Sequence, residues 1–360
     1  MICMALVLAA GLSVTGMEMW KTQVYAAETI TEESKPVSVW QKDEKGWRYF
    51  DAAGEALKSG RKSVDGGDYL FNDEGYMMTG FQWVGSSVCY FSDQGASPEA
   101  GLGKQDVSSG WKGINGNVYY FDNGTAVQGW KTISKKKFYF KNAGNPGDRG
   151  RMLTGINTIG KNTYYFNAGG NYGTKGKMMT GWQTVNKKRY YLYSNGKMAK
   201  NTYIQGYQVT SSGALSKKAY ALQKKVKSII AKKTKKNQSK SAKLKTCYMY
   251  VVKSFSYKRS YSFKKTKSWE MNYAYAMLTK KKGNCYSYAA TFSFFARELG
   301  YNPKTITGQI TARRGGFTPH SWVEIKMGKK TYIFDPEMQH ANGYNLYKKT
   351  YRNAGLRYKK

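Results

Sequence analysis

The chain has 360 residues, of which 41% are hydrophobic, and a formal net charge of +37. A chain of this length can form two domains that each bury a core. Its cysteines, at positions 3, 89, 247 and 285, are too few and too scattered for a disulfide scaffold, and no C-x-x-C pair indicates zinc. We therefore expect no metal and no cofactor, and cysteine chemistry that rests on individual thiols.

The N-terminal residues have the pattern of a targeting signal. Residues 2–14 form an apolar run of roughly a dozen residues, shorter than the about 20 needed to span a bilayer. The sequence Val24-Tyr25-Ala26 ends in the small residue of a cleavage site. We predict a signal peptide at 1–26, a linker at 27–39 and secretion. No Lys or Arg precedes the apolar run, so an uncleaved anchor is the alternative.

Residues 40–213 repeat a short unit that contains an aromatic string, a turn glycine, and then a small residue and another glycine. The strings end at residues 50, 71, 91, 121, 140, 166 and 192, so the basic period is about twenty with insertions. Aromatic strings have high β propensity, and polar pairs such as Asp122-Asn123 lead into turns. Because a lone hairpin is marginally stable, neighbouring hairpins must stack. The pattern predicts an all-β hairpin-repeat solenoid.

The repeats resemble a known family at three places. Gly110-Trp111-Lys112, Gly129-Trp130-Lys131 and Gly181-Trp182-Gln183, beside Tyr-Tyr-Phe-like strings, are similar to the choline-binding or cell-wall-binding repeats of Gram-positive surface proteins. The resemblance implies attachment to the cell wall, through aromatic cages for the choline of teichoic acid or through a glycan. A cation–π contact is worth roughly 0.5–2 kcal/mol, so such sites act through avidity. The candidate cage residues are Trp111, Tyr120, Trp130, Tyr139, Tyr165, Trp182 and Tyr191.

Each of these aromatic residues has two possible roles, in a ligand cage or in the core of the repeats. Most buried aromatic side chains only pack in a core, so any one of them is also a candidate for the solenoid interior. Some repeats lack the tryptophan and carry Arg61, Phe81 or Ile156 in its place, so cages are not expected at every junction.

The second half of the chain, residues 214–360, is strongly basic. Residues 201–360 hold 34 Lys plus Arg and five Asp plus Glu, which gives 34 − 5 = +29. Such a surface attracts polyanions. For an exported protein these are phosphate-rich cell-wall polymers and not nucleic acid. The alternative is a solvated Lys-rich surface that only keeps the domain soluble.

Apolar residues at helical spacing predict several helices in this half, the last of them starting at Cys285. Tyr288, Phe292, Phe295 and Leu299 recur at intervals of three or four, after a break at Gly283-Asn284. Cys285 thus lies in the first turn of a buried helix that ends at Gly300. Backbone N–H groups at a helix N-terminus stabilise a thiolate and can bind the oxyanion of a tetrahedral intermediate.

Strand-like segments follow that helix and bring a histidine to an aspartate. Residues 321–326 and 331–334 predict an antiparallel hairpin, in which His320 at one end lies within about two residues of the position opposite Asp335. Pro336 ends the second strand. A thiol, an imidazole and a carboxylate are the groups needed for nucleophile, proton carrier and orienting group in covalent acyl transfer.

The motifs around these residues resemble a second family. Asn284-Cys285-Tyr286, His320-Ser321-Trp322 and Phe334-Asp335-Pro336 are similar to the transglutaminase-like superfamily of papain-type thiol enzymes. The resemblance implies an α+β papain-like fold, with Cys285 as nucleophile, His320 as base and acid, and Asp335 as the group that orients the ring. Taken singly, a cysteine or a histidine is more often a packed structural residue than a catalytic one.

The second oxyanion donor and the competing residues complete the candidate site. Trp269 or Tyr273 could supply a side-chain donor, with core packing as the alternative. His340 lies in a polar stretch with no strand to position it, and Cys247 is expected in a helix core. Calcium dependence is not expected, because no cluster of Asp or Glu has calcium-loop spacing.

Three functions are compatible with these residues. The first is a wall-attached acyl transferase that joins a protein or peptide carbonyl to an amine. The second is a cysteine peptidase or amidase, since the fate of the acyl-enzyme depends on which acceptor reaches it. The third is a non-enzymatic adhesin that retains only the fold. A degenerate copy would be expected to lose one of Cys285, His320 and Asp335, and none is missing.

Overall fold

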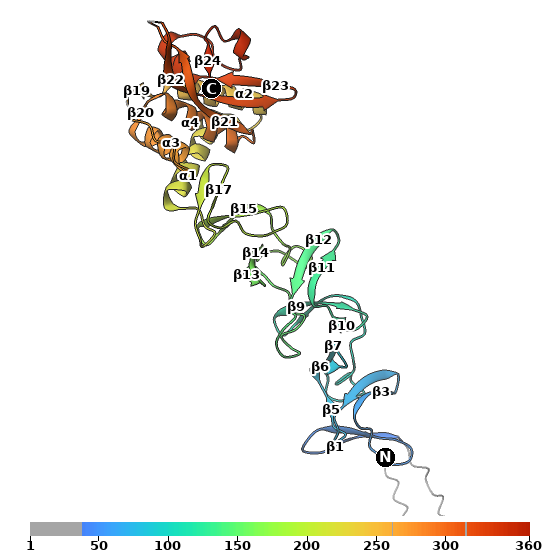
Figure 1. The fold of residues 1–360 in the computed structure, drawn as a ribbon. Helices are drawn as coiled ribbons and strands as arrows, with labels where there is room; N and C mark the ends of the chain where they lie inside the picture. Colours follow the sequence, from blue (N-terminus) through green and yellow to red (C-terminus); the bar gives the residue numbers. More distant parts are fainter. Residues whose placement is uncertain (1–37, 261, 314) are drawn as a thin grey trace, which may run out of the picture. The chain divides into compact units, whose positions relative to one another are not determined.

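The computed structural model describes residues 38–360 except 261 and 314, and Figure 1 labels many of their elements. The predicted signal peptide at 1–26 and nearly all of the predicted linker lie outside the described residues. None of the helices in the described part combines the length and apolarity that membrane crossing requires. The chain divides into two compact units. The first contains the residues up to Thr79 together with Phe91–Gln105, and the second contains Gly80–Tyr90 together with Asp106–Lys360.

The N-terminal half is built from β-hairpins, as the aromatic strings predicted. Its strands are β1 (Val39–Lys42), β2 (Trp47–Phe50), β3 (Gly60–Val64), β4 (Gly67–Phe71), β5 (Met77–Met78), β6 (Gly80–Val84), β7 (Ser87–Phe91), β8 (Gly110–Ile114), β9 (Asn117–Asp122), β10 (Thr125–Ala126), β11 (Gly129–Ile133), β12 (Lys136–Phe140), β13 (Gly155–Ile159), β14 (Asn162–Phe166), β15 (Gly181–Val185), β16 (Lys188–Leu192), β17 (Thr202–Ile204) and β18 (Tyr207–Val209).

Tight turns set the register of these hairpins. Ser134 and Lys135, between β11 and β12, have φ of 47° and 62°, and Asn186 and Lys187, between β15 and β16, have φ of 48° and 62°. Positive φ at both central residues is the property of a type I′ turn, whose twist matches that of paired strands. The resulting register places Trp130 opposite Tyr139, and it likewise pairs Trp111 with Tyr120 and Trp182 with Tyr191.

Successive hairpins of the second unit are joined by one recurring backbone hydrogen bond. The N–H of Met178, just after one hairpin, donates to the carbonyl of Lys137 in the preceding hairpin at 2.8 Å, and Met198 donates to Thr163 at the same distance. Phe140 and Phe166, the last aromatic residues of their strings, have no exposed surface. Each hairpin therefore completes its hydrogen bonds and its core with a neighbour.

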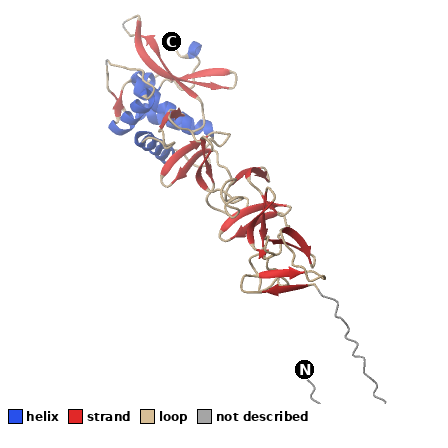
Figure 2. Cartoon of the chain, turned by 60° about the horizontal axis from the view of Figure 1, so that its bottom comes forward, coloured by secondary structure: helices blue, strands red, loops and turns tan. Residues whose placement is uncertain are grey.

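The C-terminal half contains helices and strands, in agreement with the predicted α+β class. Its elements are α1 (Lys217–Lys233), α2 (Lys240–Lys253), β19 (Ser256–Tyr257), α3 (Trp269–Lys280), β20 (Lys282–Gly283), α4 (Cys285–Glu298), β21 (Pro303–Thr311), β22 (Phe317–Met327), β23 (Lys330–Phe334), α5 (Pro336–Asn342), a 3₁₀ turn (Tyr351–Asn353) and β24 (Tyr358–Lys359). Figure 2 shows the larger helices gathered on one side of the antiparallel sheet, whose strand order is β23-β22-β21-β24.

Helix α4 is the centre of this half. Most of its residues are buried, because it contacts α3 and α2 as well as β21 and β22. The helix begins at Cys285 and ends before Gly300, as the spacing of its apolar residues predicted. Strand β22 is longer than predicted and already includes His320, because it pairs with β21 in addition to β23. The sheet therefore holds His320 against the N-terminal end of the central helix.

Candidate active site

Cys285 is the first residue of α4, and the local sequence explains why the helix starts there. The Asn284 side chain caps the helix by accepting a hydrogen bond from the Ser287 N–H at 3.2 Å. Such a cap satisfies one of the N–H groups that a helix start leaves without a partner. The Cys285 side chain is buried, with 6% exposure. The thiol is thus held at the positive end of the helix dipole.

His320 contacts both Cys285 and Asp335. Its Nε2 lies 2.8 Å from Asp335 Oδ2, and the ring also hydrogen-bonds the Cys285 side chain. Burial alone would lower the pKa of His320, but the charge and hydrogen bond of Asp335, followed by the contact with Cys285, raise it well above its usual value. The arrangement therefore favours a charged imidazolium between a carboxylate and the sulfur.

Asp335 is fully buried and its carboxylate is fixed by three partners. Oδ1 accepts a hydrogen bond from the Met338 N–H at 3.1 Å, which caps α5, while Oδ2 accepts from the Tyr358 hydroxyl at 2.9 Å in addition to its contact with His320. The Tyr248 hydroxyl donates to the Asp335 backbone carbonyl at 3.0 Å. Sequence analysis missed both tyrosines, since they lie 23 and 87 positions away with no pattern that links them to the motif.

Glu337 is a second carboxylate beside the histidine. Its Oε2 lies 3.7 Å from His320 Nδ1, the ring nitrogen that does not face Asp335. Burial raises the pKa of Glu337 to about 7, against the lowering effect of His320. Ligand atoms of His320, Asp335 and Glu337 all lie within 4.8 Å of one another, a spacing that could hold a metal ion. A metal there would compete with Cys285 and Asp335 for the two ring nitrogens.

The two predicted oxyanion donors lie in different surroundings. Trp269 is buried and packs edge-on against Phe263, at 5.3 Å between ring centroids. Tyr273 is half-buried, and its pKa is raised by burial and then by the charge of Cys285. Tyr257 in β19, which sequence analysis missed, has a pKa raised by the same two causes in the same order. Both phenols are therefore within electrostatic range of the thiol.

The competing histidine and cysteine have other partners. His340 Nδ1 lies 2.8 Å from the Val252 carbonyl oxygen, in α5 against the end of α2. Cys247 lies in the core of α2, where burial raises its pKa to about 12. Neither residue belongs to the group formed by Cys285, His320 and Asp335.

Six of the seven candidate cage residues form direct cross-strand pairs. Ring centroids are 5.1 Å apart for Trp111 and Tyr120, and 5.0 Å apart for Trp130 and Tyr139, in both cases edge-on. In each case the next hairpin adds a further ring that was not predicted. The ring of Phe138 lies 5.0 Å from that of Trp111, and the ring of Tyr164 lies 5.0 Å from that of Trp130, between centroids. These clusters therefore combine rings from neighbouring hairpins.

Tyr165, Trp182 and Tyr191 have different surroundings from the two clusters around Trp111 and Trp130. The cross-strand partner of Tyr165 is Ile156, and Tyr164 is the ring of its string that reaches Trp130. Trp182 and Tyr191, 5.1 Å apart, pack against the C-terminal core, and Tyr207 supplies the further ring there at 6.3 Å from Trp182. The last pair is thus partly covered by the domain that follows it.

Internal cations already lie over two of these tryptophans. Lys137 Nζ is 4.6 Å from the centroid of the Trp130 ring, and the Arg189 guanidinium is 5.5 Å from that of Trp182. Both cations are two positions before the tyrosine that pairs with the tryptophan. The half-buried rings of these two tryptophans therefore accept positive charge.

The fold and the site define a modular protein of aromatic hairpin repeats followed by a domain that brings Cys285, His320 and Asp335 together. Residues 227–336 match the model of the transglutaminase-like superfamily. Residues 179–212 match a choline-binding repeat, and residues 109–124 and 128–145 match a putative cell wall binding repeat. The chain thus carries a transglutaminase-like core domain after choline-binding and cell-wall-binding repeats, as both resemblances predicted. The repeats point to association with the surface of a Gram-positive-type bacterium.

Several solved structures are similar to part of the chain. Choline binding protein F from Streptococcus pneumoniae is 31% identical over 49% of this chain and 57% of its own length, with a TM-score of 0.36. The choline-binding domain of CbpL from the same organism is 25% identical over 49% of this chain and 85% of that domain, with a TM-score of 0.29. The chain therefore spans little more than half of choline binding protein F. No curated protein matches the chain.

Proposed function

We propose that the protein is an exported, wall-attached thiol enzyme that transfers acyl groups through a thioester on Cys285. The observation that carries this proposal is the placement of His320, whose Nε2 lies 2.8 Å from Asp335 Oδ2 and whose ring also hydrogen-bonds the Cys285 side chain. A thiolate–imidazolium pair with a fixed carboxylate is the arrangement that activates a cysteine nucleophile.

The reaction follows from these contacts. The Cys285 sulfur attacks the carbonyl carbon of an amide, and N–H groups at the start of α4 stabilise the oxyanion. His320 donates its proton to the leaving nitrogen, the C–N bond breaks, and ammonia or an amine leaves the acyl-enzyme. His320 then takes a proton from the incoming amine, whose nitrogen attacks the thioester and releases the Cys285 sulfur.

The burial of the site supports transfer to an amine as the first candidate reaction. Cys285, His320 and Asp335 are 6%, 3% and 0% exposed, which limits the access of bulk water to the acyl-enzyme. A cysteine peptidase or amidase is the second candidate, because the same groups complete the reaction when water is the acceptor. The intact set of hydrogen bonds around His320 argues against a purely adhesive domain.

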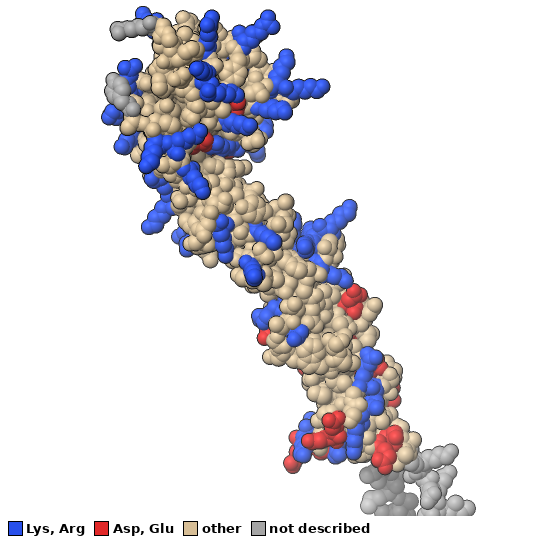
Figure 3. All heavy atoms as spheres, viewed as in Figure 1, with Lys and Arg blue, Asp and Glu red and all other residues tan. Residues whose placement is uncertain are grey.

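Attachment to the wall is assigned to residues 40–213, with the catalytic domain at 214–360 and a signal peptide at 1–26. We infer that the hairpins stack as a solenoid through their recurring backbone bonds, and that clusters such as Trp130 with Tyr139 bind choline or a glycan. Figure 3 shows Lys and Arg over much of the visible face of the C-terminal domain, with few acids. This surface suits the phosphates of wall polymers.

The test compares the protein with its Cys285→Ala variant on wall fragments and a tagged primary amine, with products identified by mass spectrometry. Tagged adducts with release of ammonia are expected from the unaltered chain and from a Cys247→Ala control, and none from Cys285→Ala. New peptide termini without tagged adducts would assign the peptidase function. If no product depends on Cys285, the result would assign the C-terminal domain to the adhesin function.

The cage proposal is tested separately by elution. Protein bound to a quaternary-amine resin should be released by free choline, and a Trp130→Ala variant should be released at lower choline concentration. Retention that choline does not change would assign the repeats to another wall ligand, such as a glycan.

A further inference from the structure

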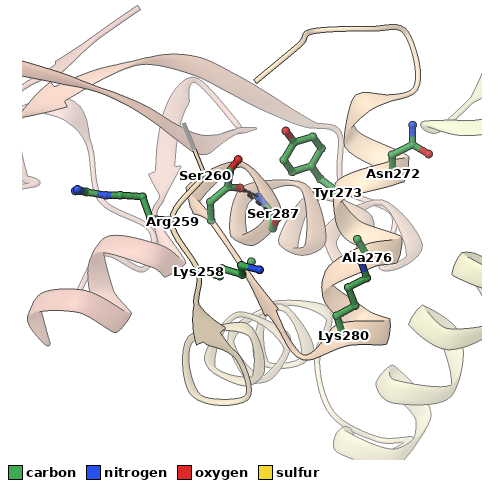
Figure 4. Close-up of a pocket in the computed structure, with 10 residues that line it drawn as sticks. Lys258, Arg259, Ser260, Asn272, Tyr273, Ala276, Lys280 and Ser287 are labelled. Carbon is green, nitrogen blue, oxygen red and sulfur yellow. Dashed lines mark hydrogen bonds between the residues drawn. The ribbon is translucent and has the colours of Figure 1, made fainter. Parts of the chain in front are cut away.

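A cavity of about 420 Å³ opens beside the first turn of the nucleophile helix. Asn284, the N-cap of α4, and Ser287 in its first turn line it on one side, and Cys285 lies between them in the chain. Figure 4 shows its other walls, which are the segment that follows β19 and the face of α3 that carries Tyr273 and Lys280. Its volume is in the range of roughly 300–1,000 Å³ typical of ligand sites. A group bound there lies beside the helix turn that presents the thiol.

The charged residues around this cavity are all basic. Lys258 and Arg259 line one wall and Lys280 lines the other, and the described lining residues include no Asp or Glu. In Figure 4 the Lys258 side chain points toward α3, whereas Arg259 points away, in line with its hydrogen bond to Tyr257. The acid of α3, Glu270, is engaged by Arg297 at 2.5 Å. Lys258 and Lys280 therefore give the lining of the cavity a net positive charge.

Tyr273 lies at the cavity and within electrostatic range of the thiol. Its ring lines the cavity, and the charge of Cys285 contributes, after burial, to the raised pKa of its phenol. The dipole of α4 adds to the same positive potential, since the helix begins at the cavity floor. An anionic group in the cavity and a carbonyl at the sulfur can therefore belong to one substrate.

We propose that this cavity binds a carboxylate of the acyl donor, so that the enzyme selects peptides with an acidic residue next to the reacting carbonyl. The inference rests on the proposed function, because it assigns the cavity to the substrate of Cys285. The positive potential comes from two exposed lysines, and each exposed ion pair contributes little binding free energy. We therefore expect a preference of about fivefold for an acidic side chain over its neutral isostere.

The test uses peptidyl fluoromethyl ketones, which alkylate an activated thiol, with Glu, Gln or Lys beside the reactive group. The rate of Cys285 labelling is measured for the full chain, for Lys258→Gln/Lys280→Gln, and for the matched control Lys225→Gln/Lys232→Gln. The control removes the same charge from exposed positions on α1 that do not line the cavity. The Glu probe should label the full chain and the control about fivefold faster than the Gln probe does. In Lys258→Gln/Lys280→Gln, the two probes should label Cys285 at the same rate.

Two further variants sharpen the test. Lys258→Glu/Lys280→Glu should reverse the preference toward the Lys probe. Ala276→Leu narrows the cavity and should slow the Glu probe while leaving alkylation by iodoacetamide unchanged.

Different results would overturn the two proposals separately. Equal labelling by all three probes, or an equal loss of preference in the control, would overturn the acidic-donor inference while the nucleophile stands. Inhibition of labelling by glycerol phosphate but not by a Glu peptide would assign the cavity to wall phosphate and overturn it as well. No labelling of Cys285 by any probe or by iodoacetamide would overturn the proposed function itself.

Discussion

The hairpin repeats and the C-terminal domain differ in how far their key contacts reach along the chain. Trp130 pairs with Tyr139 across one hairpin, and its further ring, Tyr164, comes from the next hairpin. In contrast, the partners of Asp335 include Tyr248, which lies 87 positions away, in addition to His320 and Tyr358 at 15 and 23 positions. A change in a repeat should therefore act locally, whereas a change near Asp335 should affect the whole site. The predictions below test this difference, from the largest effect to the smallest.

Asp335→Asn should cause the largest loss of activity. The amide keeps the size of the side chain but removes the charge that holds His320 in its protonated form. We expect kcat for incorporation of a tagged amine to fall by about 10³–10⁴-fold. Asp122→Asn, which removes an exposed charge in a repeat, should leave kcat unchanged. An Asp335→Asn variant with full activity would remove the Asp335 charge from the proposed mechanism.

Tyr207 belongs to a repeat but lies in the core of the C-terminal domain. Tyr207→Ala should therefore act beyond its own hairpin. Tyr207 has no exposed surface, and its ring lies 4.8 Å from that of Phe294 in α4. Its removal should lower the free energy of unfolding of that domain by about 3–5 kcal/mol. Tyr119→Ala, an almost equally buried control at 2% exposure, should leave the transition of the C-terminal domain in place. Denaturant unfolding followed by near-UV circular dichroism measures both.

The two regions should also respond to pH in opposite directions. The folded pKa of Glu337 is about 7, above its usual value of 4.5, so the domain loses stability as pH rises between these values. The loss is at most about 3 kcal/mol, and Glu337→Gln should abolish it. In the repeats, Lys141 holds the pKa of Asp148 below its usual value, so stability there is lost as pH falls. Urea midpoints between pH 3 and pH 8 would show both trends, and an unchanged profile in Glu337→Gln would contradict the first.

Tyr358→Phe should have the smallest effect. It removes one hydrogen bond to the Asp335 carboxylate without emptying space in the core. A net loss of about 1 kcal/mol corresponds to a fall in kcat of roughly fivefold. If the tyrosine positions Asp335, kcat should fall while KM changes little. Tyr344→Phe at an exposed position provides the control, and an equal change in both variants would remove the positioning role from Tyr358.

Local sequence patterns predicted the elements and the motif positions of the site. The start of α4 at Cys285 could be read from the break at Gly283-Asn284 and the apolar spacing that follows, because helix boundaries depend on neighbouring residues. The pairing of Trp130 with Tyr139 likewise follows from one turn and its register. The hairpin that brings His320 toward Asp335 was predictable for the same reason, although β22 extends further because it also pairs with β21.

Contacts between distant segments could not be predicted, since no local pattern marks them. Tyr358, Tyr248 and Glu337 complete the surroundings of Asp335 and His320 only after the sheet and α5 have packed on the helices. The burial of Tyr207 in the C-terminal core is of the same kind. The sequence by itself determined the repeats, the class of the C-terminal half and the positions of Cys285, His320 and Asp335, which depend on short-range spacing. Only the tertiary structure decided which side chains orient those residues and which charges surround them, because packing joins segments that the chain keeps far apart.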